Sequence, residues 1–153
     1  MNILLTGGTG YIGSHTAVVL AGAGHRPVLL DNLSNSSADV VDRLAQITGT
    51  RFPFIEGDIR DTALLRRVLA DEGIGAVVHF AGLKAVGESV EQPLRYYDNN
   101  VGGTISLLQA MDETGVGTLV FSSSATVYGQ PAYLPLDEVH PTGATNPYGR
   151  TKL

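Results

Sequence analysis

Short apolar runs alternate along the chain with stretches in which apolar residues recur at helical spacing. The runs are rich in Ile, Leu, Val and Phe, as expected for buried strands, and the stretches between them have the 3.6-residue period of amphipathic helices. The pattern predicts five strands, at 3–5, 27–30, 52–55, 76–80 and 119–121, with helices between them at 12–23, 40–47, 65–69 and 101–108.

Glycine and aspartate mark the ends of these predicted helices. Gly24, Gly49, Gly73 and Gly115 stand where a left-handed residue commonly ends a helix, and Asp61 can cap the start of the third helix. Regular alternation of strand and helix requires crossover connections, which place helices on both faces of a parallel sheet. The sequence therefore predicts an α/β fold with a doubly wound parallel sheet of the Rossmann type.

The pattern changes after the fifth predicted strand. Residues 129–145 are rich in Pro, Gly and polar side chains, which predicts a loop. Asn146 and Pro147 then suit the N-cap and first position of a helix over 148–153. A sheet of this type normally has a sixth strand, and without one the fifth would be an exposed edge. We therefore expect the chain to be a fragment.

Composition and charge exclude several classes of partner. A formal charge of −5 with no run of Lys or Arg argues against a nucleic-acid groove. The chain has no cysteine, and its four histidines lack metal-ligand spacing, so we expect no metal site. No apolar run reaches transmembrane length, and the glycine-rich segment begins too early to leave room for a signal peptide. We expect a cytoplasmic protein without a membrane partner.

The segment Thr6-Gly7-Gly8-Thr9-Gly10-Tyr11-Ile12-Gly13 joins the first strand to the first helix. Glycines at 7, 10 and 13 permit a tight turn, close approach of backbone N–H groups to a pyrophosphate, and close packing of helix against strand. The positive end of the helix then faces the phosphates. Glycine-rich turns also occur where nothing binds, but this position between strand and helix favours a dinucleotide site.

Two carboxylates follow the second and third strands. Asp31 lies 18 residues after Gly13, about where an acidic residue bonds to the adenosine ribose; this favours NAD over NADP, since a 2′-phosphate would meet the carboxylate. The alternative is a turn-forming aspartate before Asn32. Asp58 either accepts a hydrogen bond from the adenine amino group, with Ile59 packing on the ring, or caps a turn or helix, and the sequence favours neither.

The segment Phe80-Ala81-Gly82-Leu83-Lys84 follows the fourth strand, at the carboxyl edge where ligands bind in such sheets. Its small residues, Ala81 and Gly82, let a cofactor lie close to the backbone. Lys84 stands beside the expected nicotinamide ribose, and we interpret it as a ligand contact rather than a solvated lysine. Asn99 is either an exposed helix residue or a cofactor contact.

Three residues near the end of the chain suit proton transfer. Tyr148 and Lys152 are four apart and share a helix face, and an adjacent ammonium lowers the pKa of a tyrosine toward the range of a useful base. Ser124 ends the fifth strand, and its hydroxyl can bond to the same substrate oxygen. Tyr-x-x-x-Lys alone is common by chance, but together with the glycine turn and Asp31 it indicates a proton acceptor beside a hydride acceptor.

The whole chain resembles the extended short-chain dehydrogenase/reductase family, and within it the enzymes that epimerise UDP-sugars at C4′. Sugar-nucleotide 4,6-dehydratases are similar overall but carry an acidic pair where this chain has Ala125 and Thr126, which disfavours dehydration. The segments that carry the resemblance are TGGTGYIGSH (6–15), LDNLSNS (30–36), EGDIRD (56–61), HFAGLKAVGES (79–89), YYDNNVGGT (96–104), FSSSATVYG (121–129) and NPYGRTKL (146–153).

The resemblance implies a mechanism without net redox change. Tyr148 would remove the proton from the sugar 4′-hydroxyl while C4′ passes hydride to bound NAD; Lys152 would hold the cofactor ribose and lower the tyrosine pKa, and Ser124 would position the 4′-oxygen. Rotation of the 4-keto sugar and return of the hydride would interconvert UDP-glucose and UDP-galactose. The resemblance also implies a UDP-sugar partner, a homodimer of the full-length form, and NAD contacts from Tyr11, Ile12, Asp31, Asn32, Asp58, Ile59, Phe80, Lys84 and Asn99.

Length is where the chain departs from this family, whose members continue into a smaller domain that grips the UDP group. We expect residues 1–153 to be an incomplete NAD-binding Rossmann domain that lacks the substrate domain and is inactive in isolation. Two alternatives stay open. One is a non-catalytic NAD-binding module, and the other is a related epimerase acting on UDP-N-acetylhexosamines or UDP-pentoses.

Overall fold

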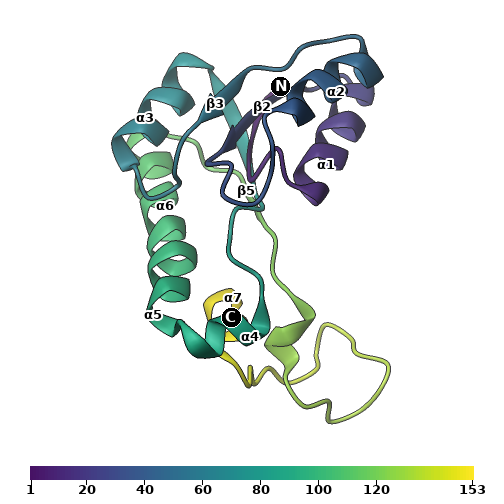
Figure 1. The fold of residues 1–153 in the computed structure, drawn as a ribbon, viewed down its shortest axis with the longest axis vertical. Helices are drawn as coiled ribbons and strands as arrows, with labels where there is room; N and C mark the ends of the chain where they lie inside the picture. Colours follow the sequence, from purple (N-terminus) through teal and green to yellow (C-terminus); the bar gives the residue numbers. More distant parts are fainter. The chain divides into compact units, whose positions relative to one another are not determined.

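The structure, a computed structural model, describes residues 1–153 and divides them into two compact units. The first, the sheet unit, comprises Met1–Ala81 and Gly103–Ser122. The second, the helical unit, comprises Gly82–Gly102 and Ser123–Leu153. Figure 1 labels the elements of both units.

A five-stranded, wholly parallel sheet forms the centre of the sheet unit, in the order β3-β2-β1-β4-β5. The order reverses between β1 and β4, which makes their carboxyl ends the switch point at which such sheets bind ligands. The predicted doubly wound parallel sheet is thus confirmed. The strands are β1 (Asn2–Thr6), β2 (Arg26–Asp31), β3 (Phe54–Glu56), β4 (Ile74–His79) and β5 (Leu119–Phe121). The third strand begins later than predicted, after Phe52 and Pro53, because proline cannot donate a hydrogen bond to a sheet.

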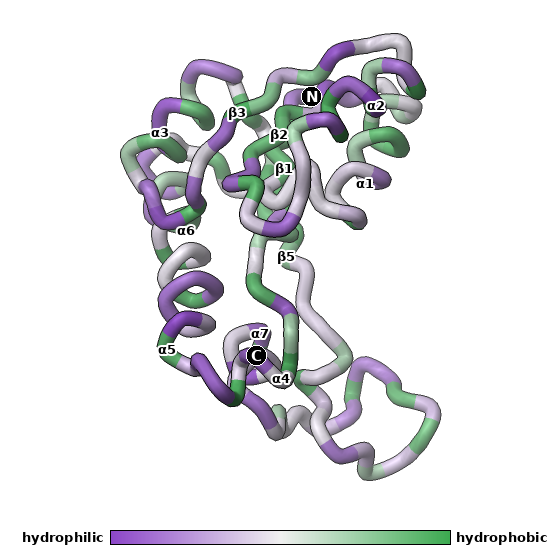
Figure 2. The backbone as a smooth tube through the Cα atoms, viewed as in Figure 1, coloured by the Kyte–Doolittle hydropathy of each residue, from purple (hydrophilic) through white to green (hydrophobic).

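Helices cover both faces of this sheet (Figure 1). On one face α1 (Tyr11–Gly22) and α2 (Asp39–Thr48) cover a core cluster centred on Leu5 and Leu29. On the other, α3 (Thr62–Asp71) and α6 (Gly103–Thr114) cover a cluster centred on Leu4 and Val77. Figure 2 shows the hydrophobic colour along β1 and β2, whereas α2 and α3 alternate between hydrophobic and hydrophilic residues. Neighbouring residues of one strand therefore enter opposite cores, as strand geometry requires.

The buried face of α1 is not the one that its largest apolar residues indicate. Ile12 and Val19 are 57% and 70% exposed, while Gly13 and Ala17 are buried. Small side chains face the sheet because they let the helix backbone approach the strands closely. A similar shift occurs in α6, where the spacing of Val101, Ile105 and Leu108 predicts the helix. The residues that α6 buries are Gly103, Leu107, Ala110 and Met111.

The predicted helix ends are confirmed. Gly24, Gly49, Gly73 and Gly115 all have positive φ, between 56° and 81°. Asp61 accepts a hydrogen bond from the Leu64 backbone N–H at 2.9 Å and so caps α3.

The helical unit contains short elements that hydrophobic periodicity did not predict. These are α4 (Val86–Glu91), α5 (Pro93–Tyr96), the π-helix η1 (Tyr97–Gly102) and the 3₁₀-helix η2 (Ala125–Tyr128). The predicted last helix is present as α7 (Pro147–Lys152), and the Asn146 side chain caps it by accepting a hydrogen bond from the Gly149 N–H at 2.8 Å. The predicted loop over 129–145 closes at its base, where the Gly143 N–H donates to the Val127 carbonyl at 2.8 Å. None of the helices is both long and apolar enough to cross a bilayer.

Replacing Asp61 with Ala should lower the free energy of unfolding by about 1 kcal/mol, because the Leu64 N–H loses its side-chain acceptor and the positive end of α3 loses a favourable charge. Urea denaturation of both forms measures this loss. Asp71→Ala, at the carboxyl end of the same helix, is the matched control. It removes a negative charge from the negative end of the helix dipole and should be neutral or slightly stabilising. Equal losses in the two variants would contradict the capping role.

Candidate functional site

The glycine turn packs directly against the segment that follows β4. A Cβ added to Gly7, which has a φ of +68°, would lie 2.8 Å from the Ala81 nitrogen, and one added to Gly13 would lie 2.3 Å from the Gly7 carbonyl oxygen. No side chain caps the amino end of α1, whose N-cap residue is Gly10. The turn therefore requires glycine at these positions, and it leaves the first N–H groups of α1 without a side-chain partner, as an anion site needs.

Asp31, at the end of β2, ties the glycine turn to the loop that follows. The buried carboxylate accepts hydrogen bonds from the Thr9 N–H at 3.2 Å, the Leu33 N–H at 3.0 Å and the Ser36 hydroxyl at 3.2 Å. The hydrogen bond from Leu33 closes a turn, which is the alternative role that the sequence left open for Asp31. A carboxylate has about four acceptor positions, so this turn leaves room for a ribose hydroxyl.

Asp58 forms a turn and an ion pair. Its carboxylate accepts hydrogen bonds from the Arg60 backbone N–H and guanidinium at 2.8–2.9 Å and from Asn32 Nδ2 at 3.3 Å. These bonds, led by those of the Arg60 side chain, lower the Asp58 pKa to about 2. The carboxylate is therefore ionised at neutral pH and keeps its acceptor character, and its contact with an adenine amino group stays a prediction.

Ile59 has a core position. It is buried, and a Cβ added to Gly103 would lie 2.4 Å from its Cδ1 atom. Its side chain thus fills the space left by a glycine at the start of α6. A contact of this residue with an adenine ring stays a prediction.

A hydroxyl–imidazole network, not predicted from the sequence, joins the ends of β1 and β4. Thr6 Oγ1 lies 2.6 Å from His79 Nδ1 and accepts a hydrogen bond from the Ala81 N–H at 3.3 Å. Thr104 Oγ1 lies 3.0 Å from the other ring nitrogen of His79, whose side chain is fully buried. The network fixes the backbone that leads into Phe80 and Ala81, two predicted cofactor contacts that are half-buried.

The helical unit holds the three predicted catalytic residues. Tyr148 and Lys152 are both half-buried on α7, and burial lowers the pKa of the Lys152 ammonium. Ser124 precedes η2, and its Oγ accepts hydrogen bonds from the Thr126 N–H at 3.3 Å and the Thr126 hydroxyl at 3.0 Å. A Cβ added to Gly149 would lie 2.9 Å from the Thr126 carbonyl oxygen, so α7 and η2 are in close contact. The structure therefore packs α7, which carries Tyr148, against η2, which Ser124 caps.

Asn100, which we did not single out from the sequence, connects α7 to the segment after β4. Its side chain, 3% exposed, accepts from the Leu83 N–H at 2.8 Å and donates at 2.9 Å both to the Leu83 carbonyl and to Thr151 Oγ1. As a result a Cβ added to Gly82 would lie 3.4 Å from Lys152 Nζ. Asn99 donates to the same Asn100 oxygen at 3.0 Å. An asparagine inside a helix is unfavourable unless its side chain has such partners, and this is the signal that could have identified Asn100.

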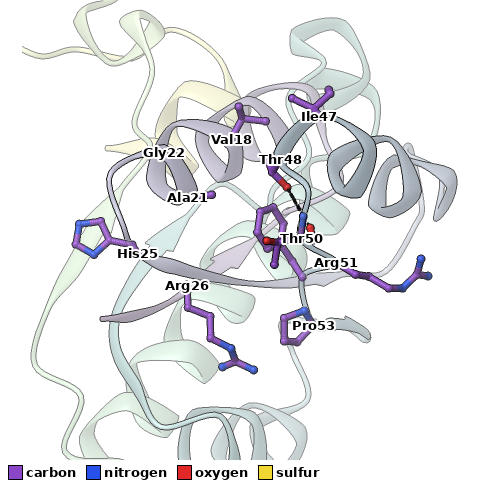
Figure 3. A pocket seen from close by; sticks show the side chains of 11 residues that line it. Val18, Ala21, Gly22, His25, Arg26, Ile47, Thr48, Thr50, Arg51 and Pro53 are labelled. Carbon is purple, nitrogen blue, oxygen red and sulfur yellow. Dashed lines mark hydrogen bonds between the residues drawn. The ribbon is translucent and has the colours of Figure 1, made fainter.

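A pocket of about 380 Å³ lies elsewhere in the sheet unit (Figure 3). Residues from the carboxyl ends of α1 and α2 and from the segments that lead into β2 and β3 line it, among them Val18, Ile47 and Phe52. It is therefore at the amino end of the strands, whereas doubly wound sheets bind ligands at the carboxyl end. The pocket contains none of the predicted site residues.

A family model described as GDP-mannose 4,6-dehydratase matches residues 4–153. The chain belongs to this family. Among curated relatives of this chain, the UDP-glucose 4-epimerase of Bacillus subtilis (strain 168) is 58% identical over 153 residues. These residues are 100% of this chain and 45% of the relative. The UDP-glucose 4-epimerase of Neisseria meningitidis serogroup A is 57% identical over 99% of this chain and 45% of its own length.

The chain is also similar to solved structures of UDP-glucose 4-epimerases. The UDP-glucose 4-epimerase of Stenotrophomonas maltophila, with bound NAD and formylated UDP-arabinopyranose, matches with a TM-score of 0.98 and 53% identity. The match covers 99% of this chain and 45% of that one. These findings confirm the resemblance to extended short-chain dehydrogenases/reductases and to their epimerase members. The chain spans less than half the length of the relatives it matches.

Replacing Gly13 with Ala should lower the free energy of unfolding by about 1–3 kcal/mol, because the new Cβ would overlap the Gly7 carbonyl and the turn would have to shift. Chemical denaturation of this family member measures the loss. Gly22→Ala is the matched control, since it lies at the end of the same helix and an added Cβ there meets nothing within 4 Å. That change should be neutral or should stabilise by up to about 1 kcal/mol. A Gly13→Ala protein as stable as Gly22→Ala would show that the turn can accommodate a side chain.

Proposed function

We propose that the chain is the NAD-binding and proton-transferring part of a UDP-glucose 4-epimerase. The observation that carries the proposal is the packing of α7 on η2 and on Asn100, which gathers Ser124, Tyr148 and Lys152 in one compact unit. The identity to UDP-glucose 4-epimerases over the whole chain supports it. In such a protein the UDP group would be held by residues that correspond to the part of the relatives outside the match.

The residues of the sheet unit suit the adenosine and pyrophosphate of NAD. The glycine turn presents backbone N–H groups without Cβ atoms around them, and the start of α1 adds the positive end of a helix dipole. Gly7, Gly10, Tyr11, Ile12 and Gly13 would surround the pyrophosphate. Asp31 and Asn32 would bind the adenosine ribose, Asp58 and Ile59 would lie at the adenine, and Phe80, Ala81, Gly82, Lys84 and Asn99 would contact the rest of the cofactor.

The proton transfer falls to the helical unit. Bound NAD would supply the acceptor and later the donor of the hydride at C4′. Tyr148 accepts the proton of the 4′-hydroxyl and returns it when the sugar is reduced again. Lys152, four residues on along α7, would hold the cofactor ribose. Both residues are half-buried.

A second candidate substrate is a UDP-pentose. The Stenotrophomonas maltophila structure that matches this chain holds formylated UDP-arabinopyranose, and this bound five-carbon sugar supports the second candidate. The homodimer and the cytoplasmic location stay predictions.

Conversion of UDP-galactose tests the proposal directly. In the full-length gene product, Tyr148→Phe should reduce kcat by about 10²–10⁴-fold, the usual contribution of a general base, while NAD affinity changes little. Tyr128→Phe, on η2, is the matched control and should keep activity within about twofold. An inactive full-length protein that still binds NAD would sink the epimerase proposal and favour a non-catalytic module.

Cofactor choice gives a separate test of Asp31. Changing Asp31 to Asn keeps an oxygen for the Leu33 turn but removes the charge that a 2′-phosphate would meet. We expect the ratio of NAD to NADP affinity, measured by titration calorimetry, to fall at least tenfold. Asp39→Asn, an exposed change at the start of α2, should leave the ratio as it is. The assignment of Asp31 would be wrong if both variants kept the original ratio.

A further inference from the structure

Lys84 lies on a short segment whose two neighbouring residues both form hydrogen bonds to side chains of the α5–η1 region. The residue before it, Leu83, is bonded through its N–H and its carbonyl to the Asn100 side chain. The residue after it, Ala85, donates its N–H to the Tyr96 hydroxyl at 3.0 Å. Tyr96 and Asn100 are four residues apart across the junction of α5 and η1, so they project from one face. The lysine side chain itself is exposed.

Tyr96 is more than a packing residue. It is the largest of the fully buried side chains, and its hydroxyl also donates to Glu88 Oε2 at 2.7 Å. Packing alone would be served by phenylalanine, which fills the same space without a polar atom to desolvate. The buried hydroxyl therefore needs partners, and those it has are a backbone N–H beside Lys84 and a carboxylate on α4.

The charges around this hydroxyl fix the direction of each bond. Glu88 is paired with Arg95 at 2.6 Å, and the Tyr96 hydrogen bond is the main cause that lowers the Glu88 pKa. Desolvation, reinforced by the hydrogen bond to Glu88, raises the pKa of Tyr96 to about 12. At neutral pH Glu88 is thus a carboxylate that accepts, and Tyr96 is a neutral phenol that donates to it. The remaining lone pairs of the phenol oxygen face the Ala85 N–H.

We infer that Tyr96 is a positioning residue for Lys84: its hydroxyl, held by Glu88, fixes the Ala85 end of the segment that carries the lysine. The inference rests on the proposed function, since the cofactor contact of Lys84 belongs to that proposal. A lysine ammonium stands on a flexible four-carbon stem, so fixing its backbone reduces the freedom it loses when it binds a ribose hydroxyl or phosphate oxygen.

A double-mutant cycle on NAD affinity of the full-length protein tests the inference. Tyr96→Phe should weaken NAD binding about tenfold, whereas Tyr97→Phe, at the exposed neighbouring tyrosine, should change it less than twofold. If Tyr96 acts through Lys84, the combined Tyr96→Phe and Lys84→Ala variant should bind NAD no more weakly than Lys84→Ala alone. Additive losses would overturn the inference, because a general loss of structure does not depend on Lys84.

Amide hydrogen exchange at Ala85 tests the hydrogen bond between the Ala85 N–H and the Tyr96 hydroxyl without any cofactor. We expect the Ala85 amide to exchange at least tenfold faster in Tyr96→Phe than in the wild type or Tyr97→Phe, and to change little in Glu88→Gln, which keeps an acceptor for the phenol. An unchanged Ala85 rate in Tyr96→Phe would overturn the inference. A wild-type protein that binds no NAD would instead overturn the proposed function, and the exchange rates would still decide whether Tyr96 holds the Lys84 segment.

Discussion

The absence of a Cβ on Gly7 is the constraint on which the candidate site depends. The turn after β1 and the segment after β4 meet at the switch point of the sheet, and Gly7 lies so close to Ala81 that no side chain fits between them. The Thr6–His79–Thr104 network holds the same two segments from within the core. Because β1 and β4 are fixed together at this point, the start of α1 and the pair Phe80 and Ala81 lie at the same edge of the sheet.

Within the helical unit a comparable role falls to Asn100. Its one amide group bonds to Leu83 and Thr151, which are 68 residues apart in sequence. Fixing the end of α7 in this way also fixes Lys152 near Gly82. The short helix α7 has only six residues, too few to be stable alone, so its position depends on such side-chain bonds, on its Asn146 cap and on its close contact with η2.

Sequence reasoning predicted the fold because its signals are local. Strand periodicity and positive-φ glycines such as Gly24 and Gly49 depend on neighbouring residues, and all five strands were found. The buried face of α1 was not predicted, because glycine and alanine at 13 and 17 are buried for their small size and not for their hydrophobicity. Asn100 and His79 were missed for another reason: each acts by hydrogen bonds to residues far away in sequence, and no local pattern encodes those bonds.

The chain matches a family model named for a dehydratase and is also similar in sequence to epimerases, and the resemblance stated above implies that the two chemistries differ at the residues after Ser124. Ser124 Oγ accepts two hydrogen bonds from Thr126, so its own hydrogen is left to donate to a substrate oxygen. The resemblance stated above implies that Thr126 stands at one of the two positions where dehydratases carry an acid, and in the structure its side chain bonds to the serine. The arrangement at the start of η2 therefore leaves the Ser124 hydroxyl hydrogen free for the donor role that we propose for it at the 4′-oxygen.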